Sequence, residues 1–385
     1  MQLVSATEDL AIGGLPYPGF PILLWDSMDS CVPVNHFFRH YLLRGAIGSV
    51  KSWAPTGRAL YDYFSFLQAH ALSWEDVDRG EAKTLLAAYR DYCFRVAKLA
   101  RSTVRQRLLY ICEFYEFAHR QEWIGRLPYS QEARRSRRSR GMLGHLHRGD
   151  HVSTRDVMPR AHLGLPRFLS AAQIKGLLAA ATNPHHRMII RLALGSGLRK
   201  EELATFPLAY VVNPDRLTNS RNIRIDLDPF DGQGIKTKGS RERVIFVSRR
   251  LMRDLHQYAV HYRGERASLN NSAQRPLFLN QDGQLYSADG KSLDRIVRLI
   301  GQKAGLKVWT HMLRHTYATH TLVALQRNRA GNRLEPLVFL QKQLGHASPQ
   351  STLIYLHLIQ ELADDAVLTY DGELEDLARS ADGQA

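Results

Sequence analysis

The sequence is poor in cysteine, in acidic residues and in long apolar runs, and each shortage excludes a class of protein. Its three cysteines, Cys31, Cys93 and Cys112, form no CxxC pair and have no ligand spacing with histidine. Neither a disulfide framework nor a zinc site is supported, so we expect no metal and buried thiols in a reducing cytosol. No apolar run of about 18 residues occurs, and the N-terminus lacks the basic and apolar regions of a signal peptide. We therefore expect a soluble cytoplasmic protein with no membrane partner.

The shortage of acidic residues leaves a large positive charge. The chain has 52 Lys and Arg against 37 Asp and Glu, a net charge of +15. Such a surplus favours a polyanionic partner, most often nucleic acid, although membrane surfaces and ribosomes also attract basic proteins. Charge alone leaves open a basic protein with no nucleic-acid role. The length of 385 residues predicts two or more domains, each with its own core.

The N-terminal part of the chain divides into an irregular start and a helical region. Residues 1–25 are rich in glycine and proline, which predicts an irregular leader. From Ser30 to Trp123, apolar and aromatic residues recur at spacings of three and four. That periodicity predicts four amphipathic helices packed as a small bundle, at residues 34–45, 57–72, 80–97 and 102–123. An aromatic stripe in the last helix is expected to pack in the core rather than to stack on bases: Tyr110, Phe114, Tyr115 and Phe117.

Basic residues follow in that helix and in the segment after it. Thr103, Arg105 and Arg107 near the helix start suit a DNA major groove or DNA phosphates, and a solvated helix end capped by Ser102 is the open alternative. Periodicity stops between residues 126 and 167, and such a segment cannot bury a core. We expect an inter-domain linker that contacts DNA through a run of arginines: Arg134, Arg135, Arg137 and Arg138.

A second domain is expected from residue 168 onward. Ser170 and Gln173 form a capping box before an apolar helical run. A later helix is broken at GSG (residues 195–197), which places Arg199 in the first turn of the next helix and Glu202 three residues on. The pair is either a surface ion pair or a carboxylate that orients a working arginine. Two runs rich in β-branched residues, NIRIDLDP and RERVIFVS, then predict a β-hairpin with Lys236 and Lys238 beside its turn.

The C-terminal stretch concentrates groups suited to phosphate chemistry. His311, Arg314 and His315 stand at i, i+3 and i+4, so on a helix they share one cationic face. Ser348-Pro349 is a helix start, which places His346 on the turn before that helix and Tyr355 about two turns into it. A guanidinium holds two phosphoryl oxygens bidentately, and a phenol is available as a nucleophile.

Together the motifs GSGLRKEEL, KTKGSRER, HMLRH and LGHAS, followed by a tyrosine nine residues after the last histidine, resemble the tyrosine recombinase (phage integrase) family. The resemblance covers both domains. It implies a mainly α fold with a small β-sheet or hairpin. Residues 26–125 would form a helical core-DNA-binding domain and 126–167 a basic linker. Residues 168–385 would form an α+β catalytic domain whose C-terminal tail, about Glu361 to Leu377, docks on a neighbouring protomer.

The resemblance also implies roles for individual residues. Tyr355 would attack a DNA phosphorus, leaving a 3′-phosphotyrosyl link and a 5′-hydroxyl protonated by Lys238, with no metal and no cofactor. Arg199 and Arg314 would clamp the phosphate oxygens, and His311 and His346 would complete the pocket. Glu202 and His315 would support these groups, and Lys236 and Arg241 would contact DNA. Tyr317 is expected in the core, and Tyr370 lies in an acidic tail that repels phosphate.

The resulting expectation is a site-specific recombinase of a mobile element or phage. Its partner would be a double-stranded recombination site, in the cytoplasm with the nucleoid. It would act as a homo-tetramer on synapsed DNA and be a monomer or weak oligomer when free. A type IB topoisomerase-like relaxing enzyme and a non-catalytic DNA-binding protein on the same fold are the alternatives. Residues 326–336 resemble an insertion between helices, and Ser196 replaces the family's more usual threonine.

Overall fold

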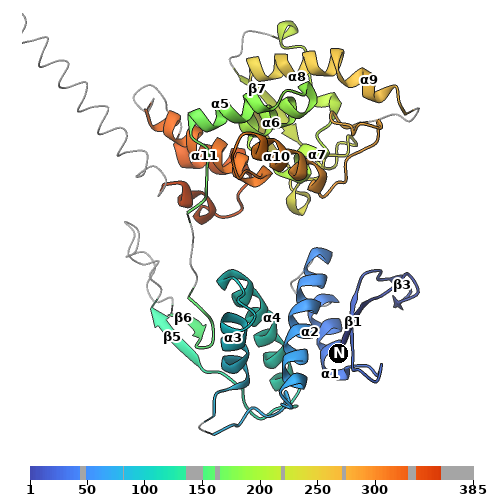
Figure 1. The fold of residues 1–385 in the computed structure, drawn as a ribbon, viewed down its shortest axis with the longest axis vertical. Helices are drawn as coiled ribbons and strands as arrows, with labels where there is room; N and C mark the ends of the chain where they lie inside the picture. The colour runs from blue at the N-terminus through green and yellow to red at the C-terminus, as the bar shows by residue number, and fades with distance from the viewer. Residues whose placement is uncertain are drawn as a thin grey trace, which may run out of the picture. The chain divides into compact units, whose positions relative to one another are not determined.

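The computed structural model describes residues 1–43, 49–80, 82–135, 151–160, 165–217, 222–270, 275–327 and 335–356. The chain divides into two compact units, Met1–Leu163 and Gly164–Ala385 (Figure 1). Both units are mainly helical, and each sheet among the described residues is a single antiparallel strand pair. The predicted fold class, mainly α with a small β-hairpin, is confirmed.

The N-terminal unit is built on the four predicted helices. They are α1 (Val32–Phe38), extended by a π-helical turn over Arg39–Leu43, α2 (Trp53–Ala69), α3 (Leu85–Arg95) and α4 (Arg101–Arg120). Aromatic rings fill the space between them, and the hydroxyls of Tyr63 and Tyr115 meet at 2.6 Å in the interior. Phe114, Tyr115 and Phe117 are buried as predicted, whereas Tyr110 is only half-buried. Helix α4 begins after Ala100, so Ser102 is not its cap.

The segment expected to be an irregular leader forms strands instead. Strand β1 (Gln2–Ser5) pairs antiparallel with β4 (Pro21–Leu24), and β2 (Ala11–Ile12) pairs with β3 (Leu15–Pro16). The β1–β4 pair packs on α2, where a Cβ at Gly57 would lie 2.8 Å from Cβ of Pro21. The glycine and proline residues mark the turns between short strands, and this turn-rich composition hid the strands.

The expected linker likewise contains a strand pair, β5 (Gln131–Arg135) with β6 (His151–Arg155). Arg155 donates to Glu113 and Glu116 of α4 at 2.7 and 2.8 Å, so its charge is neutralised against the helix bundle. Tyr129 and Val157 are buried in the core of the same unit. A charge-rich composition therefore concealed a segment that in part belongs to the N-terminal unit, whose boundary falls after Leu163.

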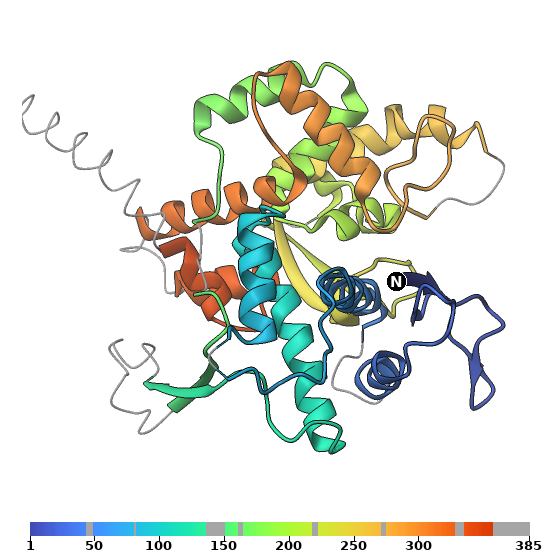
Figure 2. The ribbon, with the colours of Figure 1, turned by 60° about the horizontal axis from the view of Figure 1, so that its bottom comes forward.

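The C-terminal unit places two long helices, α6 (Pro184–Ser196) and α11 (Thr310–Arg327), against each other (Figure 2). The hairpin of β7 (Asn222–Leu227) and β8 (Arg243–Ser248) buries alternate residues, as its pattern predicted. The other elements are α5 (Ala171–Ala180), α7 (Lys200–Ala204), α8 (Arg249–His261), α9 (Arg263–Ala267), α10 (Lys291–Lys303), α12 (Pro336–Leu344) and a final helical segment over residues 350–356. The predicted capping box of Ser170 and Gln173 is present.

Two contacts fix the loop after α12, which carries His346. The side-chain amide of Gln343 bonds to both the backbone N–H and the carbonyl of Phe246 on β8, at 2.9 and 3.0 Å. Gly345 ends α12 with φ +63, and a Cβ there would lie 2.6 Å from Cδ of Arg243. Glycine is therefore required both by the backbone conformation and by the neighbouring side chain.

Candidate active site

Arg314 on α11 is the most deeply buried cation of the site, with 1% of its surface exposed. Its two terminal nitrogens donate to the carbonyls of Gly197 and Leu344, both at 2.6 Å. Burial, and then the nearby Arg199, lower the pKa of Arg314 to about 9. The guanidinium thus remains charged at neutral pH, and its two closest acceptors are neutral carbonyls.

Arg199 reaches the same place from the break between α6 and α7. Helix α6 ends at Gly197 with φ +66, and a Cβ there would lie 2.5 Å from the Tyr317 ring. Arg199 is the N-cap residue of α7, one position before the first turn in which it was predicted. Its side chain donates to Oε1 of Glu202 at 3.1 Å and to the carbonyl of Gly345 at 3.0 Å.

Glu202 is fully buried and binds a second arginine that the sequence analysis did not assign. Arg243, at the start of β8, donates to Oε1 and Oε2 of Glu202 at 2.6 and 2.7 Å. Burial would raise the pKa of Glu202, but the hydrogen bonds and charges of Arg243 and Arg199 outweigh it and lower that pKa. The surface-pair alternative for Glu202 is wrong. The signal for Arg243 was its place as the last residue of KGSRER, at an inward end of the hairpin.

Tyr355 lies in the final helical segment with 2% of its surface exposed. Its hydroxyl is 2.9 Å from Nδ1 of His315, and its ring stacks on that of His346 with centroids 6.3 Å apart. Burial raises the pKa of Tyr355, while the charges of Arg314 and Arg199 act to lower it. The phenol is therefore covered, but it lies within electrostatic reach of both guanidinium groups.

The three histidines surround this phenol in their neutral forms. The rings of His311 and His315 are 4.4 Å apart on one face of α11, as the i, i+4 spacing predicted. Burial, with neighbouring cations and histidines, lowers the pKa of His315 to about 4 and that of His346 to about 3. Nδ1 of His346 is 2.9 Å from the Thr352 hydroxyl. Neutral imidazoles are able to accept a proton.

Lys238 lies in the connection between β7 and β8, in a turn that Gly239 adopts with φ +69. Its side chain is exposed, and its charge contributes to lowering the pKa of His311, which places the ammonium near the cluster. Lys236 and Arg241 flank it and are also exposed. Tyr317 packs beside the apolar residues Ala318, Leu340 and Leu344, as predicted for a core tyrosine.

The predicted DNA contacts of the N-terminal unit have mixed surroundings. Thr103 is exposed, Arg105 is exposed and donates to the carbonyl of Pro159 at 2.7 Å, and Arg107 forms an ion pair with Asp62. Only the backbone of Arg134 and Arg135 in β5 is described. Arg137, Arg138, Tyr370, most of the 326–336 segment and the 361–377 tail lie outside the described residues.

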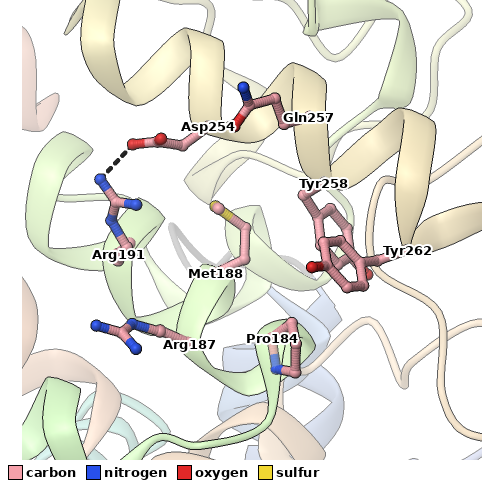
Figure 3. A pocket seen from close by; sticks show the side chains of 8 residues that line it. All are labelled: Pro184, Arg187, Met188, Arg191, Asp254, Gln257, Tyr258 and Tyr262. Atoms are coloured by element: carbon pink, nitrogen blue, oxygen red, sulfur yellow. Dashed lines mark hydrogen bonds and ion pairs between the residues drawn. The ribbon is translucent and has the colours of Figure 1, made fainter.

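A separate hollow of about 160 Å³ lies between α6 and α8 (Figure 3). Met188 and the stacked rings of Tyr258 and Tyr262 form its apolar side, and an ion pair of Arg191 with Asp254 lies at its edge. None of the predicted site residues lines it. Within the described part of the chain, no group of three or more His, Cys, Asp or Glu side chains is arranged to hold a metal ion. No described helix is long and apolar enough to cross a membrane.

Comparison with known proteins agrees with the fold and with this cluster. The model of the phage integrase family matches residues 167–361. Tyrosine recombinase XerD of Bifidobacterium longum is 29% identical over 264 residues, covering 65% of this chain and 80% of the relative. Tyrosine recombinase XerA of Saccharolobus solfataricus is 27% identical over 208 residues, covering 54% of this chain and 58% of the relative.

Solved structures show the same fold at low identity. A XerH recombinase bound to a palindromic difH substrate superposes with a TM-score of 0.57 at 18% identity, covering 84% of this chain and 81% of that one. The Tn1549 transposon integrase bound to a circular intermediate DNA gives 0.53 at 17%, with 84% and 94% covered. The fold and the matches define a tyrosine recombinase, a class of enzyme that cuts and rejoins DNA. The chain belongs to the phage integrase family.

Proposed function

We propose that this protein is a site-specific recombinase of a mobile element or phage, and that Tyr355 cuts its DNA site. The observation that carries the assignment is the position of the Tyr355 hydroxyl, 2.9 Å from a neutral His315 and within reach of the charges of Arg314 and Arg199. A nucleophile next to a base and near cations is the arrangement that phosphodiester cleavage requires.

Each step of the proposed cleavage has a group to perform it. The Tyr355 oxygen attacks phosphorus as its proton passes to His315, and the phosphorus–O5′ bond breaks to leave a 3′-phosphotyrosyl link. Lys238 donates a proton to the departing 5′-oxygen. Arg199 and Arg314 stabilise charge on the non-bridging oxygens, most strongly in the transition state. His311 and His346 complete the phosphate pocket, and attack by a partner strand's 5′-hydroxyl reverses the chemistry.

The proposed partner is a double-stranded recombination site. The XerH and Tn1549 structures were obtained with DNA bound, which supports the same partner here. We propose that basic residues of both units contact the duplex: Thr103, Arg105, Arg107, Arg134, Arg135, Arg137, Arg138, Lys236 and Arg241. We also propose that four copies assemble on two synapsed sites, with the 361–377 tail of each docked on its neighbour.

Covalent trapping tests this function and finds the target together. Purified protein is incubated with sheared DNA of the genome that encodes it and then denatured, and the DNA that stays linked to protein is sequenced. We expect a recurrent site at the end of a mobile element. Recovery only of one chromosomal site would replace the mobile-element role by a chromosomal one, and linkage to arbitrary sequences would favour a relaxing enzyme.

The matched pair Tyr355→Phe and Tyr317→Phe assigns the nucleophile. Both substitutions remove one hydroxyl from a largely buried ring in the same cluster, but only Tyr355 is in contact with His315. We expect Tyr355→Phe to bind the recovered site and form no covalent adduct, while Tyr317→Phe still forms one. An adduct with the Tyr355→Phe protein would refute the assignment.

A further inference from the structure

Glu202 is a fully buried carboxylate that is shared by two arginines with different geometries. Arg243 approaches it head-on and uses both terminal nitrogens, one on each carboxylate oxygen, at 2.6 and 2.7 Å. Arg199 reaches it with a single side-chain bond, the longer one of 3.1 Å to Oε1. The stronger bidentate pair therefore belongs to Arg243 and not to the arginine assigned to the phosphate.

This division leaves Arg199 with unused donors. A guanidinium has five N–H groups. Among the described residues, the side chain of Arg199 makes two hydrogen bonds, to Glu202 and to the carbonyl of Gly345. Three N–H groups remain for the oxygens of a phosphate. If Arg243 did not occupy the carboxylate, the buried charge of Glu202 would draw Arg199 into a bidentate pair and turn those donors inward.

Arg243 also links the three segments that carry the site. Its Nε is 3.4 Å from the carbonyl of Gln343 in α12, and its Cδ lies where a Cβ on Gly345 would collide. Its backbone begins β8, five residues after Lys238. With 9% of its side chain exposed, it is poorly placed to contact DNA itself.

We propose that Arg243 is a positioning residue for cleavage: by occupying both oxygens of Glu202, it keeps Arg199 turned toward the scissile phosphate. The proposal rests on the proposed recombinase function. It assigns Arg243 an effect on the rate of bond breaking at saturating DNA, with little effect on DNA affinity. It also requires that this effect pass through the negative charge of Glu202.

Single-turnover cleavage of a nicked duplex carrying the trapped site measures the first part. We expect Arg243→Met to lower the maximal rate about 100-fold and to change the half-saturating DNA concentration less than threefold. Arg243→Lys restores the charge but not the bidentate geometry, so we expect a rate about tenfold below the wild type. Arg224→Met is the control, since Arg224 lies on the partner strand and pairs only with the exposed Asp226 among the described residues.

A double-mutant cycle with Glu202→Gln tests the route of the effect. The amide removes the charge that would capture Arg199, so we expect Arg243→Met to cost less than threefold further in that background. A 100-fold loss in both backgrounds would overturn the proposal, as would an unchanged maximal rate with weakened binding. If Arg243→Met does not fold, the lysine variant decides, and a rate within threefold of the wild type would overturn it. Absence of any adduct from the wild-type protein would instead remove the proposed function.

Discussion

Arg107 in the N-terminal unit and Arg314 in the C-terminal unit are both withdrawn from solvent, but they meet different partners. Arg107 is paired with the carboxylate of Asp62, and Arg155 of the same unit is paired with Glu113 and Glu116. Arg314 donates to two backbone carbonyls, and Arg199, Arg243 and Arg314 have one fully buried carboxylate, Glu202, near them. The N-terminal unit cancels its inner charges, whereas the C-terminal unit keeps a local excess of 3 − 1 = +2 over these four groups.

The difference shows which arginines serve stability and which serve a ligand. A cation held by neutral carbonyls is positioned without losing its charge, so it stays available to an anion that arrives later. A cation paired with a carboxylate is already compensated, and further binding of an anion would have to compete with that pair. Three predictions examine the two sides of this comparison.

Arg314→Lys carries the largest expected effect. Lysine keeps a positive charge but cannot reach the carbonyls of Gly197 and Leu344 with the fixed fork of a guanidinium. We expect single-turnover cleavage to fall on the order of 10³-fold, about 4 kcal/mol of transition-state stabilisation. Arg155→Lys is the counterpart in the N-terminal unit and should leave the rate of the folded protein within about threefold. Equal losses from both substitutions would remove the distinction between the two units.

The second prediction concerns the histidine that the C-terminal unit buries far from its cations' carboxylate. His185 is 3% exposed, and its ring nitrogens meet the hydroxyls of Tyr258 and Tyr286 at 2.6 and 2.9 Å. Burial, then the charges of Arg266 and His186, lower the pKa of His185 to about 3. Between that value and the unfolded pKa of about 6.5, the unfolded chain binds a proton that the folded one does not. Stability therefore falls as pH falls through this window.

The expected loss from His185 is about 2 kcal/mol between pH 7.5 and pH 5, confined to the C-terminal unit. Hydrogen exchange followed by mass spectrometry locates the loss, because the two units are assigned by their peptides. His185→Gln retains a hydrogen-bonding side chain without a titrating group and should flatten the pH dependence by that amount. An identical slope in the variant would show that His185 is not the responsible group.

Motifs with strict local spacing were predictable from the sequence. The i, i+3, i+4 set on α11, the helix break at Gly197 and the helix start near Ser348 each depend on neighbours within a few residues, and the structure contains all three. Arg243 was missed because its partner Glu202 lies 41 positions away and the Gln343 carbonyl 100 positions away. The strands β1 to β6 were missed because glycine, proline and charged residues dominate those segments, and it is tertiary packing that stabilises their pairing.

Asp62→Asn carries the smallest expected effect and examines the cancelled charge directly. Asp62 accepts from Arg107 and from the Tyr89 hydroxyl, the latter at 2.7 Å, and both members of the ion pair are partly exposed. The amide should destabilise the N-terminal unit by about 1 kcal/mol, because it weakens a half-buried pair. It also returns the charge of Arg107, which was predicted to contact DNA, and we expect several-fold tighter DNA binding with a salt dependence steeper by about one phosphate contact. The double variant Asp62→Asn, Arg107→Met should lose that gain. If Asp62→Asn leaves both affinity and salt dependence unchanged, Arg107 has only a structural role, and its pairing with Asp62 does not regulate contact with DNA.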